Sequence, residues 1–292
     1  MPDICPICSC ASVRTLRRDV SNADNNFVSC EKCGHSFCSK PPYDGLENSP
    51  EKFNQKAFFG EEGAPLPEWG KMIDVEYENY AEGICRIFRK YAPGKNFLEI
   101  GCGTGSFLRC LARRSDFVLH GNDISPKAAG IVREALGIPV TGQSFAKELY
   151  LPQKFDMVFA AHVIEHIVDA YAFISDIRAV CNPGAIVGIV CPNQKSLTSL
   201  LKMKFLYPRK THEYGHLHWP AHIHGYSPRS LRYLMKNSGF IPVKTELWNK
   251  AQKKYPYNPK LSDRIFYPVY IAEFLFGRGN IIVDFYRKTT GS

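Results

Sequence analysis

The spacing of apolar residues predicts a long helix at residues 72–91. Apolar side chains recur there at nearly the 3.6-residue period of an α-helix, at Met72, Val75, Tyr80, Ile84, Ile87, Phe88 and Tyr91. Pro93 and Gly94 follow this stretch, and the pair is typical of a turn. We therefore expect the helix to end just before them.

Beyond this helix, short apolar runs alternate with segments of helical periodicity. Strands are predicted at residues 96–100, 117–121, 157–161 and 185–191, and helices at 106–114, 126–136 and 168–180. Parallel strands joined by right-handed helical crossovers form a sheet that is covered on both faces. The expected fold class is therefore α/β, with a doubly wound, mostly parallel sheet.

The first 40 residues contain six of the eleven cysteines of the 292-residue chain. Two pairs, Cys5 with Cys8 and Cys30 with Cys33, have the Cys-x-x-Cys spacing of a zinc ribbon, in which two turns each offer two thiolates to a tetrahedral zinc ion. The apolar residues between the pairs supply almost no core, so zinc binding is expected to fold this segment. We predict a zinc ribbon at residues 1–40.

Three further donors, Cys10, His35 and Cys38, lie close to these pairs and compete with them as ligands. The regular spacing favours the two pairs. Four thiolates leave no open position for water, so the expected zinc site is structural rather than catalytic. Residues 41–71 follow, are rich in residues that break helices and strands, and are expected to form a linker or a cap.

A glycine-rich turn, Gly101 to Gly105, lies between a predicted strand and a predicted helix. Such a turn lets backbone N–H groups approach a ligand closely. Asp123 ends the next strand, at about the offset where a carboxylate bonds a ribose diol. A dinucleotide and S-adenosylmethionine are the two candidate ligands. The glycine spacing favours S-adenosylmethionine, as does Glu99, because its carboxylate suits an ammonium group and would repel a pyrophosphate.

Three segments resemble the motifs of class I S-adenosylmethionine-dependent methyltransferases, in order and at matching separations. They are residues 98–105, 122–126 and 155–167. The likeness covers about residues 72–250 and a closing strand near 280–288. It implies a seven-stranded, Rossmann-like methyltransferase domain at residues 72–292, with insertions at 196–226 and 251–279.

The same resemblance implies roles for individual residues of the donor site. Glu99 and the glycines would hold the methionine end, Asp123 would bind the ribose, and residues 143–145 would lie near the adenine. Residues 160–162 would close the pocket beside the methyl group. The cofactor-binding candidates are Glu99, Gly101, Gly103, Gly105, Asp123, Ile124, Ser144, Phe145 and Ala161.

His162, Glu165 and His166 come just after the strand predicted at 157–161, on the side where open α/β sheets bind ligands. This stretch resembles the Glu-x-x-Glu-His segment of metal-assisted O-methyltransferases, but His162 stands in place of the first glutamate. A divalent ion at Glu165 and His166 is therefore in doubt, and the alternative is that the pair only orders the start of a helix. If the stretch is helical, His162 and His166 share a face.

Five of the nine histidines lie in residues 211–226, where insertions in the family commonly cover the acceptor. They are His212, His216, His218, His222 and His224. One histidine with a pKa near its ordinary value could take the proton of an acceptor hydroxyl during in-line methyl transfer. The catalytic candidates are His162, His166, His216, His218 and His222. For each of them, packing or adventitious metal binding is the alternative.

A net charge of +9 favours anionic partners, such as a nucleotide sugar, a phospholipid surface or RNA. The start of the chain lacks a signal-peptide pattern, and no apolar stretch approaches the roughly 18 to 20 residues that span a bilayer, so a cytoplasmic location is expected. Residues 265–276 are apolar. They are expected to form a packed helix or a dimer surface, with peripheral membrane contact as the alternative.

The expected function is O-methylation of a small molecule or a saccharide, with S-adenosylmethionine as donor and a histidine as general base. An RNA methyltransferase that uses the ribbon to bind RNA is the first alternative, although the ribbon carries only the scattered basic residues Arg14, Arg17, Arg18 and Lys32. A non-catalytic, zinc-dependent scaffold is the second. The intact Glu99, glycines and Asp123 argue against it.

Overall fold

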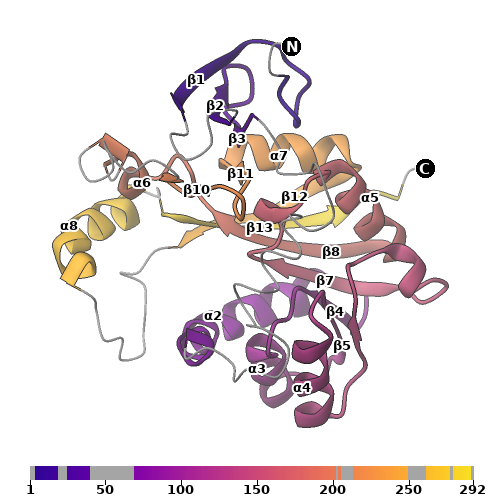
Figure 1. Cartoon of the computed structure of the whole chain (residues 1–292). Coiled ribbons are helices and arrows are strands. Elements are labelled where there is room, and N and C mark those ends of the chain that lie inside the picture. Colours follow the sequence, from indigo (N-terminus) through magenta and orange to yellow (C-terminus); the bar gives the residue numbers. More distant parts are fainter. Residues whose placement is uncertain are drawn as a thin grey trace.

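A seven-stranded sheet forms the centre of the molecule (Figure 1). The computed structural model describes residues 4–18, 25–39, 69–201, 203–204, 213–248, 261–276 and 279–290. Most of the expected linker at 41–71 lies outside these ranges. The strands are in the order β12 (Phe240–Trp248), β13 (Ile281–Lys288), β8 (Cys181–Pro192), β7 (Phe155–Ala161), β4 (Asn96–Ile100), β5 (Val118–Asp123) and β6 (Val140–Gly142).

The strands from β8 to β6 are parallel, and β13 runs antiparallel to both of its neighbours. The strand order reverses direction at β4, from which the chain continues to β5 on one side and later to β7 on the other. Ligands of open α/β sheets bind at such a switch point, outside the carboxyl ends of the strands. The predicted doubly wound, mostly parallel seven-stranded sheet is confirmed.

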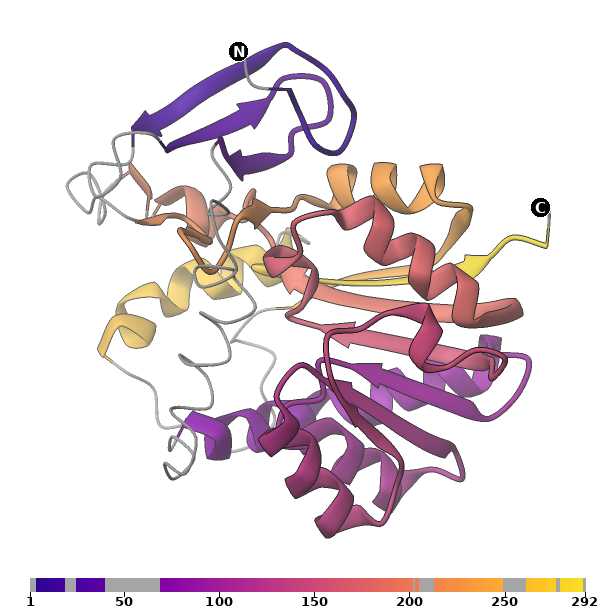
Figure 2. The same ribbon diagram turned by 45° about the vertical axis from the view of Figure 1, so that its right-hand side comes forward.

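Helices cover both faces of the sheet (Figures 1 and 2). One face carries α2 (Trp69–Tyr91), α3 (Ser106–Arg114) and α4 (Pro126–Leu136), and the other carries α5 (Ala170–Val180) and α7 (Pro228–Asn237). Each face has its own hydrophobic core. On the α2 side, the buried Phe88 ring packs edge-on against Phe97, with centroids 5.5 Å apart.

Two of these helices begin where the sequence places a serine before a proline. The Ser125 hydroxyl accepts a hydrogen bond from the Ala128 backbone N–H at the start of α4. Ser227 and Ser230 form a reciprocal capping box at the start of α7. A capping serine satisfies a free N–H group, and proline at the first helical position loses no hydrogen bond. These local signals explain why both starts are readable from the sequence.

A second, four-stranded antiparallel sheet contains the cysteine-rich segment. Its strands are β1 (Val13–Arg18), β2 (Asn26–Cys30), β3 (Ser36–Cys38) and β11 (His224–Gly225). The first three form the ribbon, while β11 belongs to the stretch just before α7. Figure 2 shows the ribbon above the sheet face that carries α5 and α7. The buried Ile7, Val28 and Phe37 join the hydrophobic core of that face.

Two further helices lie together at one end of the molecule (Figure 1). They are α6 (Leu197–Leu201) and α8 (Leu261–Leu275), and the Thr198 N–H donates to the Glu273 carboxylate across them. Tyr267, Ile271 and Leu275 of α8 are exposed. Among the described residues, no helix has both the length and the apolar character needed to cross a membrane. The expected dimer surface on α8, and its alternative of peripheral membrane contact, stay predictions.

Candidate active site

The turn after β4 has three glycines in left-handed conformations, with φ values of 73° at Gly101, 53° at Gly103 and 82° at Gly105. A side chain at Gly101 would collide with Val163, and one at Gly105 would lie 2.8 Å from Val132. Among the described residues, apart from its two chain neighbours, no atom lies within 4 Å of the corresponding position at Gly103. The turn therefore packs tightly on two sides and leaves space for a ligand at Gly103.

Asp123, at the end of β5, braces this turn. One carboxylate oxygen accepts the Gly103 N–H at 2.8 Å, and the other accepts the Ser125 N–H at 2.9 Å. Burial raises the pKa of Asp123, and the two backbone hydrogen bonds only partly offset this effect. Each oxygen keeps a lone pair that a ligand hydroxyl could use.

Glu99, near the end of β4, is 2% exposed, and its Oε2 atom has no hydrogen-bond partner in the part of the chain that the structure describes. Burial, and secondarily the charge of Asp123, raise the pKa of Glu99 well above its ordinary value. A buried carboxylate without a partner is costly, and a cation placed beside it removes that cost. The pair of carboxylates at this turn fits a ligand that brings an ammonium group and a diol, as S-adenosylmethionine does.

The other predicted donor-site residues surround the same edge of the sheet. Asn122 donates to the Gln143 carbonyl at 2.9 Å and so ties β5 to the segment that follows β6. Phe145 packs between Tyr150 and Phe173, with ring centroids 5.9 and 5.8 Å away. Ser144 is exposed, Ile124 is half-buried, and Ala161 is buried at the end of β7. Their roles in cofactor binding stay predictions.

A second group of polar side chains lies next to the turn. Glu165 and His166 belong to the short helix η3 (Ile164–His166), and together with His222 they offer ligand atoms that all lie within 4.8 Å of one another. The rings of His166 and His222 are 4.6 Å apart and nearly perpendicular. We call these three residues the acceptor-side cluster. Val163, two residues before Glu165, is the residue that fills the space beside Gly101.

Backbone carbonyls determine which nitrogen of His166 and of His222 carries the proton. The Nδ1 atom of His166 lies 3.0 Å from the Ala221 carbonyl, and Nδ1 of His222 lies 3.0 Å from the His216 carbonyl. A carbonyl oxygen only accepts, so both Nδ1 atoms carry the proton and donate. The lone pair of each ring is therefore on Nε2, which is the arrangement of a metal-binding histidine or of a base.

The protonation states of the three side chains also suit metal binding. Burial lowers the pKa of His166 to about 4 and also lowers that of His222. Burial alone would raise the pKa of Glu165, but the hydrogen bond from His162 and the nearby histidines bring it down to about 2. At neutral pH the cluster holds one carboxylate and two neutral imidazoles, the protonation states in which these side chains bind metals.

The remaining candidate histidines have other positions. His162 lies before η3 with φ of 57° and a side chain 46% exposed, so it shares no helical face with His166. Its Nδ1 atom is 3.3 Å from Glu165 Oε1. His216 contributes its carbonyl to His222, and His218 exchanges backbone hydrogen bonds with His222. His212 lies outside the described residues. Only His166 and His222 of the five catalytic candidates enter the cluster.

Gln194, which sequence reasoning did not single out, fixes the backbone that contacts His222. It is buried, and its side chain accepts the His216 N–H at 2.7 Å and donates to the Tyr214 carbonyl at 2.8 Å. These bonds hold the hairpin of β9 (Glu213–Tyr214) and β10 (Leu217–His218). A lone glutamine in a loop carries no motif, so no sequence signal could have identified it.

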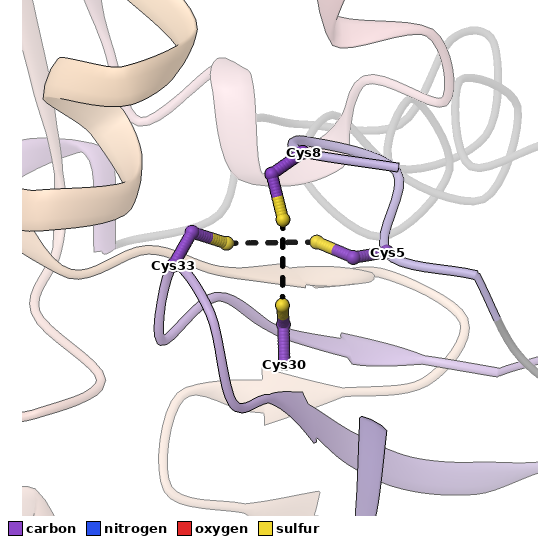
Figure 3. A group of neighbouring side chains, drawn as sticks. All are labelled: Cys5, Cys8, Cys30 and Cys33. Atoms are coloured by element: carbon purple, nitrogen blue, oxygen red, sulfur yellow. Dashed lines mark hydrogen bonds between the residues drawn. The ribbon is translucent and has the colours of Figure 1, made fainter. Parts of the chain in front are cut away.

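The four predicted zinc ligands meet at one point (Figure 3). The Sγ atoms of Cys5 and Cys33 are 3.6 Å apart, and those of Cys8 and Cys30 are 3.4 Å apart. Tetrahedral zinc with bonds of about 2.3 Å requires about 3.8 Å between sulfur atoms, so the arrangement fits the ion. All eleven cysteines lie in the described residues, and none of them forms a disulfide bond. The competing donors Cys10, His35 and Cys38 are not part of this group.

Comparison with known proteins agrees with this geometry. A family model described as a methyltransferase domain matches residues 74–245, more than half of the chain. A ubiquinone biosynthesis O-methyltransferase of Methylobacterium nodulans is 27% identical over 186 residues, which cover 58% of this chain and 74% of the relative. The protein of the same name from Brucella ovis is 25% identical over 189 residues, covering 59% of this chain and 76% of the relative.

Solved structures share the fold. A SAM-dependent methyltransferase from Archaeoglobus fulgidus matches with a TM-score of 0.50 at 18% identity, over 81% of this chain and 98% of that chain. The magnesium protoporphyrin IX methyltransferase of Synechocystis PCC 6803, with bound SAM, matches with a TM-score of 0.51 at 14% identity, over 85% of this chain and 100% of that chain. At these identities the likeness concerns the fold alone.

Proposed function

The chain belongs to the methyltransferase domain family and is an S-adenosylmethionine-dependent methyltransferase, and from this premise we propose that it methylates a hydroxyl group of a small molecule or a saccharide. The observation that carries the proposal is the acceptor-side cluster. It stands beside the donor turn, with Val163 packed on Gly101 and Glu165 two residues further on. The relatives named O-methyltransferases support the choice of oxygen as the methylated atom.

On the donor side, Glu99 would pair with the methionine ammonium and Asp123 with the ribose hydroxyls, while the glycine turn leaves space for the cofactor. Holding the sulfonium and the acceptor oxygen in line supplies much of the rate of such a transfer. Because Asp123 already braces Gly103, it would hold the turn and the cofactor at the same time.

On the acceptor side, Glu165, His166 and His222 would hold a divalent cation. One carboxylate and two imidazole Nε2 atoms form a suitable ligand set, and each histidine has its Nδ1 oriented by a carbonyl. Such an ion lowers the pKa of a bound hydroxyl. The departure of His162 from the usual glutamate, which put the ion in doubt, is offset by His222. The Cys5, Cys8, Cys30 and Cys33 thiolates would hold a structural zinc ion.

The test measures methyl transfer from radiolabelled S-adenosylmethionine to fractions of a cell extract, followed by chemical identification of the methylated atom. We expect an O-methyl product and activity that falls on treatment with a chelator and returns with Mg²⁺ or Mn²⁺. Glu165→Gln and His222→Ala should lower turnover by about 100-fold or more while S-adenosylmethionine affinity is unchanged.

His218→Ala serves as the matched control, because this histidine pairs through its backbone with His222 but lies outside the cluster. It should keep nearly normal turnover. Methylation of nitrogen or carbon, or full activity of Glu165→Gln, would overturn the assignment of the cluster to a hydroxyl acceptor.

A further inference from the structure

The ribbon touches the methyltransferase domain at the residues that build the acceptor-side cluster. Strand β3 pairs with β11, with Phe37 opposite His224 and Ser36 opposite Gly225. The Cys38 N–H donates to the Ile223 carbonyl at 3.0 Å. His222, a member of the cluster, immediately precedes Ile223, so the ribbon strand holds the backbone that carries this histidine.

The same peptide segment is held from its other side by η3. The Ile223 N–H donates to the Glu165 carbonyl at 3.0 Å. Ile223 therefore bridges the ribbon and the helix that carries Glu165 and His166. Three backbone segments distant in sequence, around Cys38, Ile223 and Glu165, are connected by two successive hydrogen bonds.

A second connection between the ribbon and the domain is made by side chains. His35 Nε2 lies 3.0 Å from His224 Nδ1, and His224 Nε2 lies 3.4 Å from the Val168 carbonyl. The carbonyl only accepts, so His224 donates from Nε2 and accepts from His35 at Nδ1. His35 and His224 are both buried. This second path again joins the ribbon to the segment that follows η3.

Both Cys-x-x-Cys turns of the ribbon contribute to these contacts. We call the turn at Cys5 and Cys8 the first knuckle and the turn at Cys30 and Cys33 the second knuckle. The Cys30 N–H donates to the His35 carbonyl at 2.8 Å, so the second knuckle determines where β3 begins. At the first knuckle, the Ile7 carbonyl accepts the Tyr171 hydroxyl of α5 at 2.6 Å. The positions of the four thiolates therefore determine how β3 and the first knuckle sit on the residues near the cluster.

The donor side is built differently. Most buried apolar residues of the ribbon belong to the core on the α5 and α7 face, while Phe27 and Cys38 form a small cluster with Leu217. Of the described ribbon residues, none belongs to the core that contains α2 and α3. The turn from Gly101 to Gly105 leads into α3. Loss of order in the ribbon should reach the acceptor side first and leave the donor turn in place.

We propose that the zinc ribbon is a positioning element of the acceptor side: with its four thiolates bound to zinc, strand β3 holds His222 in register with Glu165 and His166. The proposal rests on the proposed function only in treating this cluster as the acceptor side. Without zinc, the cluster should lose its alignment while the cofactor site persists. The ribbon would then be required for the reaction without touching either substrate.

The test compares the full-length zinc-loaded protein, the protein after zinc removal by a chelator, and the Cys33→Ser variant. Three quantities are measured: hydrogen exchange at the Ile223 amide, Mn²⁺ affinity by electron paramagnetic resonance, and S-adenosylmethionine affinity by calorimetry. Mn²⁺ is suitable because it prefers oxygen and imidazole ligands to thiolates. We expect faster exchange at Ile223, Mn²⁺ affinity about 10- to 100-fold lower, and unchanged cofactor affinity.

Cys10→Ser is the matched control, because Cys10 lies beside the first knuckle but outside the four-thiolate group. A second variant, His35→Ala, keeps all four thiolates and removes the contact with His224. It should keep its zinc and show the same changes at Ile223 and in Mn²⁺ affinity, in a weaker form, and His35→Gln should restore part of both.

Unchanged exchange at Ile223 after zinc removal would overturn the proposal. Loss of cofactor affinity in parallel with the other two quantities would also overturn it, because the ribbon would then stabilise the whole domain. If Glu165→Gln leaves the Mn²⁺ affinity of the zinc-loaded protein unchanged, or if no Mn²⁺ binds, the proposed metal site is wrong. Hydrogen exchange at Ile223 then remains as the test of the role of the ribbon.

Discussion

Glu99 illustrates how one buried residue prepares a site for its ligand. The carboxyl group of Glu99 is buried near the glycine turn, its Oε2 atom has no hydrogen-bond partner among the described residues, and the charge of Asp123 opposes its ionisation. Without a ligand, both features lower the stability of the folded protein. Both become favourable when a positively charged ligand enters, since the ligand supplies the missing charge. If S-adenosylmethionine binds here as proposed, the cost of burying Glu99 would favour a cationic cofactor.

This arrangement predicts a specific pH dependence. The pKa of Glu99 in the folded protein is well above its ordinary value of 4.5, so the folded state binds the proton more tightly than the unfolded chain. Its contribution to stability is fully present below about pH 4.5 and is lost as the pH rises through the raised pKa. A bound ammonium group favours the ionised carboxylate, so the thermal stabilisation by S-adenosylmethionine should grow over the same interval.

Melting temperatures measured with and without cofactor, from about pH 5 to about pH 8, check this expectation. Glu99→Gln should bind the cofactor more weakly and flatten the pH dependence. Glu148→Gln, an exposed glutamate of the helix η2 (Lys147–Leu149), should behave like the unmodified protein. An unchanged slope in Glu99→Gln would contradict the assigned role.

At the scale of elements, the hairpin of β9 and β10 depends on a side chain that lies outside it. The two strands are only two residues each, too short to be stable in isolation. Gln194 follows β8 and bonds both ends of the turn, while Gly215 and Gly225 pack closely on its side chain. The hairpin and His222 are therefore positioned by the large sheet through one buried amide.

Gln194→Ala should loosen this hairpin. The partly buried Tyr214 carbonyl and His216 N–H each lose a hydrogen bond to the Gln194 side chain, which should lower the free energy of unfolding by about 1–3 kcal/mol. Denaturant unfolding and hydrogen exchange at the His216 amide provide the measurements. Gln143→Ala, at an exposed glutamine, is the control. Full protection of the His216 amide in the Gln194 variant would contradict the prediction.

At the scale of the whole molecule, the ribbon is joined to the methyltransferase domain through β11, next to the residues of the cluster. The ribbon's inner strand, β3, is joined to β11, and its outer strand, β1, forms the free edge of the small sheet. Arg18 of β1 and Lys32 of the second knuckle are exposed. Charged side chains on a free strand edge are a common protection against aggregation, which is a sufficient reason for a basic residue on this strand.

Replacing Arg18 and Lys32 by serine separates the two leading functions. For a small hydroxyl acceptor, we expect kcat/KM to stay within about twofold, because neither side chain lies in the cluster or the donor turn. For an RNA acceptor, affinity would fall and its dependence on salt would weaken by about one unit of slope for each phosphate contact removed. Methyl-transfer kinetics and RNA binding at several salt concentrations distinguish these outcomes.

The sequence by itself determined the features that depend on short spacings. The Cys-x-x-Cys knuckles, the glycine turn with Glu99, the strand–helix alternation and the Ser-Pro helix starts each arise from neighbouring residues, so their chemistry is readable locally. The four cysteines meet as their spacing predicted. The matched motifs also predict a donor site at the ends of two neighbouring strands, and the roles of its residues stay predictions.

Only the tertiary structure decided which distant residues act together. It brings His222 to Glu165 and His166, places Gln194 behind the hairpin, and joins His35 to His224, 189 residues later in the chain. These contacts depend on how the ribbon and the loop before α7 pack on one face of the sheet, and no local pattern encodes that packing. For this reason the sequence alone left the divalent site in doubt and the role of the ribbon open.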